Sequence, residues 1–162
     1  MIKSEHHGGW IICFSFIVAL MLTAMPLPEW ATNWRPAWVA MVLVYWCMAL
    51  PDRIGIGLGW SMGLLLDVLQ GTLLGQNALG LAVLAYFIIK SHQRIRMFPL
   101  TQQAFLICLL VSLYLFLSLW VRGIMGIPPD SWTYWMPAFT SMLLWPWLFI
   151  ILRDIRRRYH VS

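Results

Sequence analysis

The sequence predicts an all-α integral membrane protein with about six transmembrane helices in a single domain, residues 1–162. Of the 162 residues, 61% are hydrophobic and only 10% are charged, and the mean hydropathy is +0.76. The hydrophobic and the charged fractions are both far from those of ordinary soluble domains. A hydrocarbon core of about 30 Å requires roughly 17–25 apolar residues per helix. The apolar segments therefore use up nearly the whole chain, and we expect no separate soluble domain.

The first three expected spans are bounded by proline, which ends helices because it lacks the amide hydrogen that a continuing helix needs. The segment "MPLPEW" and the pair "RP" separate the first span from the second, and "LPDR" separates the second from the third. The exit of the first span, "LTA", is a poor signal-peptide cleavage site, so we expect this helix to be retained. The expected spans are 10–25, 36–50 and 54–70.

The last three expected spans are divided by polar and basic segments. The fourth lies so close to the third that one of them could be short or re-entrant. "KSHQRIRMFP" and "RGIMGIPPDSW" separate the remaining spans, and Pro146 should kink the last one. The expected spans are 73–90, 102–121 and 136–152.

The lysines and arginines predict the orientation, because short cytoplasmic loops carry an excess of them. With six spans and both termini cytoplasmic, only Arg35 and Arg122 fall on the outer side. A five-span model would move Lys3 alone, so the count of six depends mainly on segment length. The basic residues lie beside spans and form no face of a soluble module, so we expect no nucleic-acid partner. The cytoplasmic set comprises Lys3, Arg53, Lys90, Arg94, Arg96, Arg153, Arg156, Arg157 and Arg158.

The stretch "GIGLGWSMGLLLDVLQG", residues 55–71, has glycines and one aspartate at intervals of four. In a helix, Gly55, Gly59, Gly63, Asp67 and Gly71 share one inclined face. Such small-xxx-small steps let two helix backbones approach closely in lipid. The spacing is compatible with packing inside this chain and with docking of another protein's helix.

Asp67 is unusual in an apolar segment. A carboxylate at the bilayer centre costs about 2.5–3.5 kcal/mol on insertion scales, so such groups usually face protein or water and have a role. Because Asp67 lies well past Arg53 along an inside-to-outside helix, we expect it to approach the outer leaflet. It could have a functional role or cap and pair locally within "DVLQGTLLG".

The residues that catalysis would need are missing. "GWSMG", residues 59–63, matches the serine-hydrolase pattern G-x-S-x-G, but that motif needs a strand–turn–helix elbow, and here it lies in a continuous apolar segment. The histidines fall in end or loop segments, and there is no carboxylate pair or metal-ligand cluster. Cys13, Cys47 and Cys108 are expected to be small apolar fillers. We therefore predict no enzyme activity, no cofactor and no metal site.

The residues of this region resemble a known family. The run of Gly59, Gly63, Leu64, Asp67, Gly71, Leu74, Gly75, Ala78 and Leu79 is similar to the signature segment of the MreD family, enterobacterial type. The supporting segments "RPAWVAMVLVYW" and "LPDR" before this run and "LWPWLFIILRDIRRR" after it are also in order, so the resemblance covers nearly the whole chain. It marks Gly75 together with the glycines above as residues for partner binding or helix packing.

The resemblance implies a non-catalytic, multi-pass subunit of the rod complex in the bacterial cytoplasmic (inner) membrane. Such a subunit binds MreC, contacts membrane lipid, and helps couple MreB filaments to the peptidoglycan synthases, a transpeptidase and a glycosyltransferase. The resemblance also implies a fold similar to the S subunits of energy-coupling-factor transporters, with a cavity or groove near the outer face.

The alternative is a small-molecule-binding or transport membrane subunit of the S-component type. The implied fold and Asp67 favour it, together with the polar residues clustered near that aspartate, namely Gln70, Thr72, Gln76 and Asn77.

Overall fold

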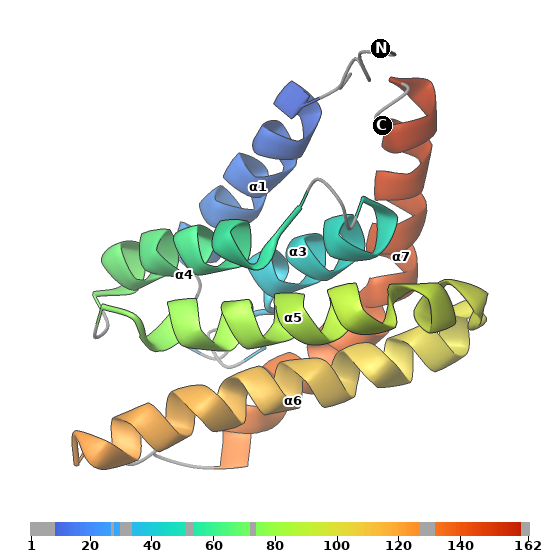
Figure 1. Ribbon diagram of the computed structural model, residues 1–162. Helices are drawn as coiled ribbons and strands as arrows, with labels where there is room; N and C mark the ends of the chain where they lie inside the picture. The colour runs from blue at the N-terminus through green and yellow to red at the C-terminus, as the bar shows by residue number, and fades with distance from the viewer. Residues whose placement is uncertain are drawn as a thin grey trace.

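The described part of the chain is a bundle of α-helices in a computed structural model (Figure 1). The structure describes residues 9–26, 28–29, 34–50, 54–71, 74–126 and 132–159. Each expected span overlaps one helix, in the expected order. The elements are α1 (Gly9–Ala24), α3 (Trp38–Ala49), α4 (Ile56–Gln70), α5 (Gln76–Met97), α6 (Leu100–Ile124), the 3₁₀ helix η1 (Trp132–Trp135) and α7 (Met136–Arg158). Helices α4, α5 and α6 lie side by side in alternating directions, and α1 and the end of α7 are inclined to them (Figure 1).

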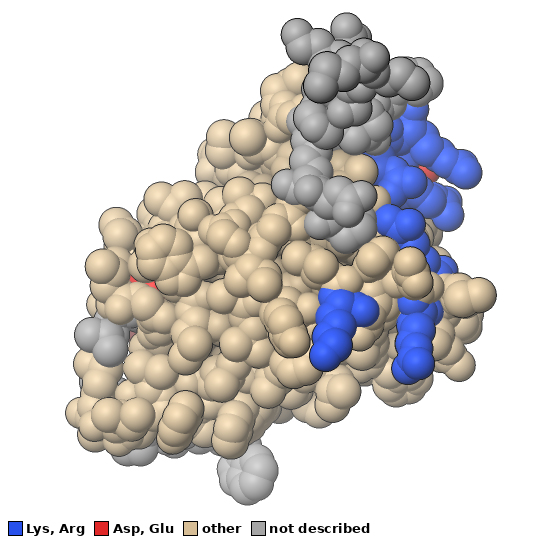
Figure 2. Space-filling model, in the orientation of Figure 1, with Lys and Arg blue, Asp and Glu red and all other residues tan. Residues whose placement is uncertain are grey.

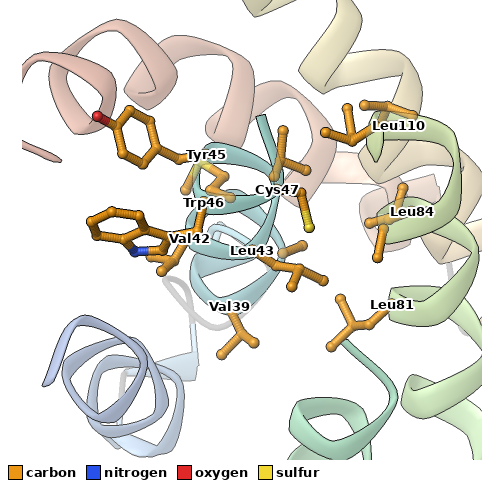
Figure 3. Packing of buried hydrophobic residues seen from close by; sticks show 14 of the residues in the cluster. Val39, Val42, Leu43, Tyr45, Trp46, Cys47, Leu81, Leu84 and Leu110 are labelled. Carbon is orange, nitrogen blue, oxygen red and sulfur yellow. The ribbon is translucent and has the colours of Figure 1, made fainter. Parts of the chain in front are cut away.

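Helix α3 is the centre of the bundle. Every residue from Val39 to Met48 is buried, and α3 contacts α1, α5 and α7. Figure 3 shows Leu43 and Cys47 of α3 turned toward Leu81 and Leu84 of α5. An apolar helix with no polar face can be buried in this way because its side chains contact neighbours all around.

The central helix is much shorter than α5, α6 and α7. At a rise of 1.5 Å per residue, the 12 residues of α3 extend about 18 Å, whereas α5, α6 and α7 extend about 33–38 Å. Its ends therefore stop inside the bundle. A cavity lies at each end of α3, one lined by Ala37 and Trp38 and the other by Met48 and Ala49.

Alternating helix direction places opposite ends of successive helices together. Near the start of α1, the Trp10 ring lies 5.5 Å from the ring of Tyr159, which directly follows α7. At the ends of α3 and α5, Arg96 donates hydrogen bonds of 2.8 Å to the carbonyl oxygens of Met48 and Ala49. We call this end of the bundle, where α5 and α7 finish, the basic end.

The basic end collects most of the described positive charge. Figure 2 shows Lys and Arg side chains gathered over the ends of α5 and α7, while the rest of this face is almost free of charge. Lys3 and Arg53 lie outside the described residues. The basic residues of these two helices are Lys90, Arg94, Arg96, Arg153, Arg156, Arg157 and Arg158.

Two helices extend further than the apolar segments indicate. Helix α5 continues through Met97, so it includes most of the segment 90–99 that was expected to separate two spans. Arg94 and Arg96 in its last turn complement the negative end of the helix dipole. Helix α7 likewise continues to Arg158 with three arginines in its last turn, and Pro146 lies inside it.

The described helices differ in whether they could cross a bilayer. By length and composition, α6 and α7 are long and apolar enough to do so, and α1, α3 and α4 are apolar but shorter. Of the three cysteines expected to fill gaps in the core, only Cys47 is fully buried. Cys108 is half-buried and Cys13 is exposed. Cys13 lies on the outward face of α1, where it fills no internal gap.

Candidate functional site

Helices α4 and α5 approach each other at two glycines. A Cβ atom at Gly63 would overlap the backbone of Ala78 and lie 2.7 Å from the carbonyl carbon of Asn77. A Cβ atom at Gly59 would lie 3.1 Å from the carbonyl oxygen of Leu81. We call this contact the α4–α5 seam. It brings backbone against backbone, which is the close approach that small residues permit between membrane helices.

The other glycines of the motif lie elsewhere. Gly55 precedes α4, and the atom closest to a Cβ built there is 4.0 Å away. Gly71 and Gly75 have φ angles of +67° and +102° and belong to the turn between α4 and α5. A left-handed backbone favours glycine because a Cβ atom is strained there. The expectation of one continuous helix face was therefore wrong for Gly71, because α4 ends before it.

Asp67 is buried, with 1% of its surface exposed, and it binds the start of α5. Its Oδ2 accepts a hydrogen bond of 2.7 Å from the backbone amide of Gly75, and its Oδ1 accepts one of 2.9 Å from that of Asn77. The first amides of a helix lack internal partners and carry a partial positive charge, so they stabilise a carboxylate. Of the two roles that the sequence allowed for Asp67, this arrangement corresponds to local capping.

A polar network continues from Asp67 into α6. The Asn77 side-chain amide donates a hydrogen bond of 3.1 Å to Gln70, and its Oδ1 accepts one from the Tyr114 hydroxyl. Gly80 makes room for this tyrosine, because a Cβ atom there would lie 2.9 Å from Cε2 of the ring. Tyr114 was not among the site residues expected from the sequence. Its phenol is one of several polar groups in the expected span 102–121, and nothing in the sequence distinguishes it from Ser112 or Ser118.

A cavity of about 310 Å³ lies beside this network, at the end of the bundle opposite the basic end. We call it the arginine cavity, because both arginines that the sequence places on the outer side, Arg35 and Arg122, line it. Of the expected polar cluster, Gln70, Gln76 and Asn77 line it too, while Thr72 lies outside the described residues. Its other lining residues are Thr23, Pro36, Ala37, Trp38, Val39, Ala40, Leu66, Tyr114, Leu115, Ser118, Tyr134 and Pro137.

Both arginines are held in place by the protein. Arg35 donates hydrogen bonds of 2.6 Å to the carbonyl oxygens of Thr23 and Met25 at the end of α1. The guanidinium carbon of Arg122 lies 5.8 Å from the centre of the Tyr134 ring. Burial raises the pKa of Tyr134 and Arg122 lowers it in part, so the net pKa stays above its ordinary value. The phenol is thus protonated at neutral pH and donates a hydrogen bond of 2.7 Å to Leu115.

The serine of the G-x-S-x-G match has no catalytic geometry. Ser61 lies within α4 and donates a hydrogen bond of 2.8 Å to the carbonyl oxygen of Gly57, one helical turn earlier. A nucleophilic serine instead needs a sharp turn and a neighbouring base. The described residues also hold no group of three or more His, Cys, Asp or Glu side chains that could bind a metal ion.

Comparisons with known proteins agree on one family. A family model described as rod shape-determining protein MreD matches residues 4–155. The chain is 35% identical over 150 residues to a protein of Haemophilus influenzae named "Rod shape-determining protein MreD", covering 92% of this chain and 93% of that protein. No solved structure matches the chain. The similarity to S subunits that the sequence implied thus has no support from that comparison.

Proposed function

Because this chain belongs to the MreD family of rod shape-determining proteins, we propose that it is a non-catalytic subunit of the bacterial rod complex. In this role it binds MreC and helps couple MreB filaments to the peptidoglycan synthases. Family membership itself gives the chain a role in rod shape determination in a membrane. The observation that carries the finer proposal is the extent of the match, which starts before α1 and ends within α7.

The surface of the bundle supports a multi-pass position in the cytoplasmic membrane. Large apolar side chains of α6 point outward, among them Phe105, Leu109 and Trp120, each at least 60% exposed. An apolar groove of about 790 Å³ also runs between α5 and α6. Exposed apolar surface of this kind is costly in water and favourable in lipid. We infer that these faces contact lipid or the helices of partner proteins.

The distribution of charge supports an orientation. Basic loops stay on the cytoplasmic side of a membrane, so we place the basic end in the cytoplasm, on the side of the MreB filaments. The arginine cavity then faces the periplasm, where the peptidoglycan synthases act. This placement also puts both chain termini in the cytoplasm.

For the motif residues we propose a role in helix packing within the chain. Gly59 and Gly63 allow the α4–α5 seam, Gly71 and Gly75 form the turn, and Asp67 caps α5. The face that Gly59 and Gly63 present is occupied by α5, which argues against direct contact between these glycines and MreC. For Gly55 the structure offers no packing reason.

The experiment is co-purification of the tagged full chain with untagged MreC of the same organism in detergent. Its variants exploit two glycines of the same helix. Gly63 lies in the seam, whereas a Cβ atom at Gly57 meets nothing within 4 Å. We compare wild type with Gly63→Leu and Gly57→Leu at equal expression, and size-exclusion chromatography reports folding.

The proposal expects wild type to retain MreC and to restore rod shape in cells depleted of their own copy of this protein. Gly63→Leu should lose MreC together with its folded profile, since it separates α4 from α5. If Gly57→Leu stays folded and loses MreC, the outward face of α4 contacts the partner. Wild type that retains no MreC and restores no rod shape would contradict the proposal.

A further inference from the structure

The arginine cavity has no assigned role, and it combines three features that attract an anion. It is lined by two guanidinium groups, and no acidic residue is among the described residues that line it. Asp67 directly follows the lining residue Leu66, and its carboxylate accepts two hydrogen bonds from the start of α5. Among the described lining residues, no carboxylate therefore neutralises the positive charge of Arg35 and Arg122.

The N-terminus of α3 is the second feature. Pro36, Ala37, Trp38, Val39 and Ala40 all line the cavity, so the first turn of α3 faces it. The N-cap residue Ala37 makes no side-chain capping hydrogen bond, and no acidic residue lies in the first turn; the Ala37 amide donates a hydrogen bond of 3.0 Å to the Ser141 hydroxyl. Because the first amides of a helix carry a partial positive charge, the end of α3 adds to the field of the two arginines.

Unused hydrogen-bond donors are the third feature. The Ser118 side chain is buried, with 4% of its surface exposed, and its hydroxyl has no partner among the described residues. Several other hydroxyls on the apolar helices donate to the preceding turn, as Ser112 does to Cys108. The Nε of Arg35 is also buried without a partner in the described residues. Buried polar groups normally have partners, so both donors indicate a bound polar molecule.

We propose that the arginine cavity binds a phosphate or diphosphate group. The positive charge of two guanidinium groups and a helix N-terminus is larger than the single negative charge of a carboxylate. A phosphate monoester carries a charge of about −1.5 to −2 near pH 7, which matches it better. The donors approach from α3, α6 and the segment before α3, which suits the tetrahedral oxygens of phosphate. The volume of about 310 Å³ accommodates such a headgroup.

The group can belong to a lipid headgroup or to a soluble phosphate compound. Apolar residues such as Trp38, Leu66 and Leu115 line the cavity together with the polar ones, which suits a headgroup whose chains lie in the bilayer. This inference goes beyond the proposed function and does not depend on MreC. Its test uses the isolated full chain.

The experiment measures binding to the full chain in detergent by native mass spectrometry. One arm titrates phosphatidic acid against phosphatidylcholine, and the other titrates inorganic pyrophosphate against succinate. The variants are Arg122→Gln, Ser118→Ala and Arg35→Gln. Arg96→Gln is the matched control, because Arg96 caps the other end of α3 with two hydrogen bonds to backbone carbonyls, as Arg35 caps α1.

We expect phosphatidic acid to bind in preference to phosphatidylcholine, and pyrophosphate in preference to succinate. Arg122→Gln should weaken binding roughly tenfold or more, and Ser118→Ala should weaken it about threefold to tenfold. Arg96→Gln should leave binding unchanged. Pyrophosphate binding without lipid binding would support a phosphate site with a soluble ligand.

Three outcomes would overturn the inference. The first is that neither phosphatidic acid nor pyrophosphate binds. In the second, Arg96→Gln reduces binding as much as Arg122→Gln, which indicates general charge attraction. In the third, succinate competes equally with pyrophosphate. Circular dichroism of each variant shows whether a loss of binding reflects a loss of fold, and Ser118→Ala, which removes one oxygen, remains informative if an arginine variant unfolds.

Discussion

Replacing Gly63 with alanine tests the α4–α5 seam with a single added methyl group. The new Cβ atom would overlap the backbone of Ala78 and lie 2.7 Å from the carbonyl carbon of Asn77. Carbon atoms prefer a separation of about 3.5–4.0 Å, so the two helices must move apart by roughly 1 Å. Both obstacles are backbone atoms, and no side-chain rotation can relieve the overlap. The displaced segment also carries the amide of Asn77, which donates to Asp67.

The expected loss of stability follows from this geometry. Overpacking costs about 1–3 kcal/mol in well-packed interiors, and for a chain of this size that lowers the melting temperature by roughly 2–12 °C. Gly57→Ala in the same helix is the control. A Cβ atom there meets nothing within 4 Å. Because alanine has a higher helix propensity than glycine, this variant should melt at or slightly above the wild-type temperature.

The assay is thermal unfolding of the detergent-purified chain, followed by circular dichroism at the helix band. The order of melting temperatures is the result that matters: Gly63→Ala below wild type, and Gly57→Ala not below it. If Gly63→Ala melts at or above Gly57→Ala, then α4 and α5 do not meet at this glycine, and the packing role proposed for the motif fails.

Three further variants test the polar contacts by the same melting assay. Asp67→Asn should cost about 1–3 kcal/mol, because the helix-capping charge is lost, whereas the exposed Asp154→Asn should change little; equal effects would count against the capping role. Tyr114→Phe should cost about 1–2 kcal/mol by removing the buried donor to Asn77, and an unchanged melting temperature would show that this hydrogen bond contributes nothing. Arg96→Gln should destabilise modestly by freeing the last carbonyls of α3; no change would show that water replaces the arginine.

The sequence could predict where the helices lie because apolar length and proline act locally. It underestimated α5, since hydropathy measures which residues suit lipid, while the helix continues through "KSHQRIR", where Ile95 is buried and Arg96 donates hydrogen bonds to the last carbonyls of α3. It could not identify α3 as the central helix. A short apolar helix with no polar face has the same pattern whether protein or lipid surrounds it.

The candidate site was partly predictable for the same reason. The capping of α5 by Asp67 involves residues at most ten apart, and local sequence contained that option. The choice between an internal seam and a partner surface did not follow from glycine spacing, because spacing does not identify the facing helix. Arg35 and Arg122 were assigned to the same side of the membrane by counting charges. Their meeting in one cavity depends on how α3 and α6 pack.

Asn77 joins the seam to the cavity, which affects how any variant is interpreted. Its backbone lies against Gly63 and binds Asp67, while its side chain binds Gln70 and Tyr114 and lines the arginine cavity. A substitution at Gly63 that moves this residue therefore disturbs the cavity as well as the helix contact. A loss of MreC in Gly63→Leu would not by itself identify an interface, because the whole end of the bundle that holds the arginine cavity would change with it. An outward-facing position of α4 has no such link to the cavity, so only a loss there, with the fold intact, would assign the partner to that face.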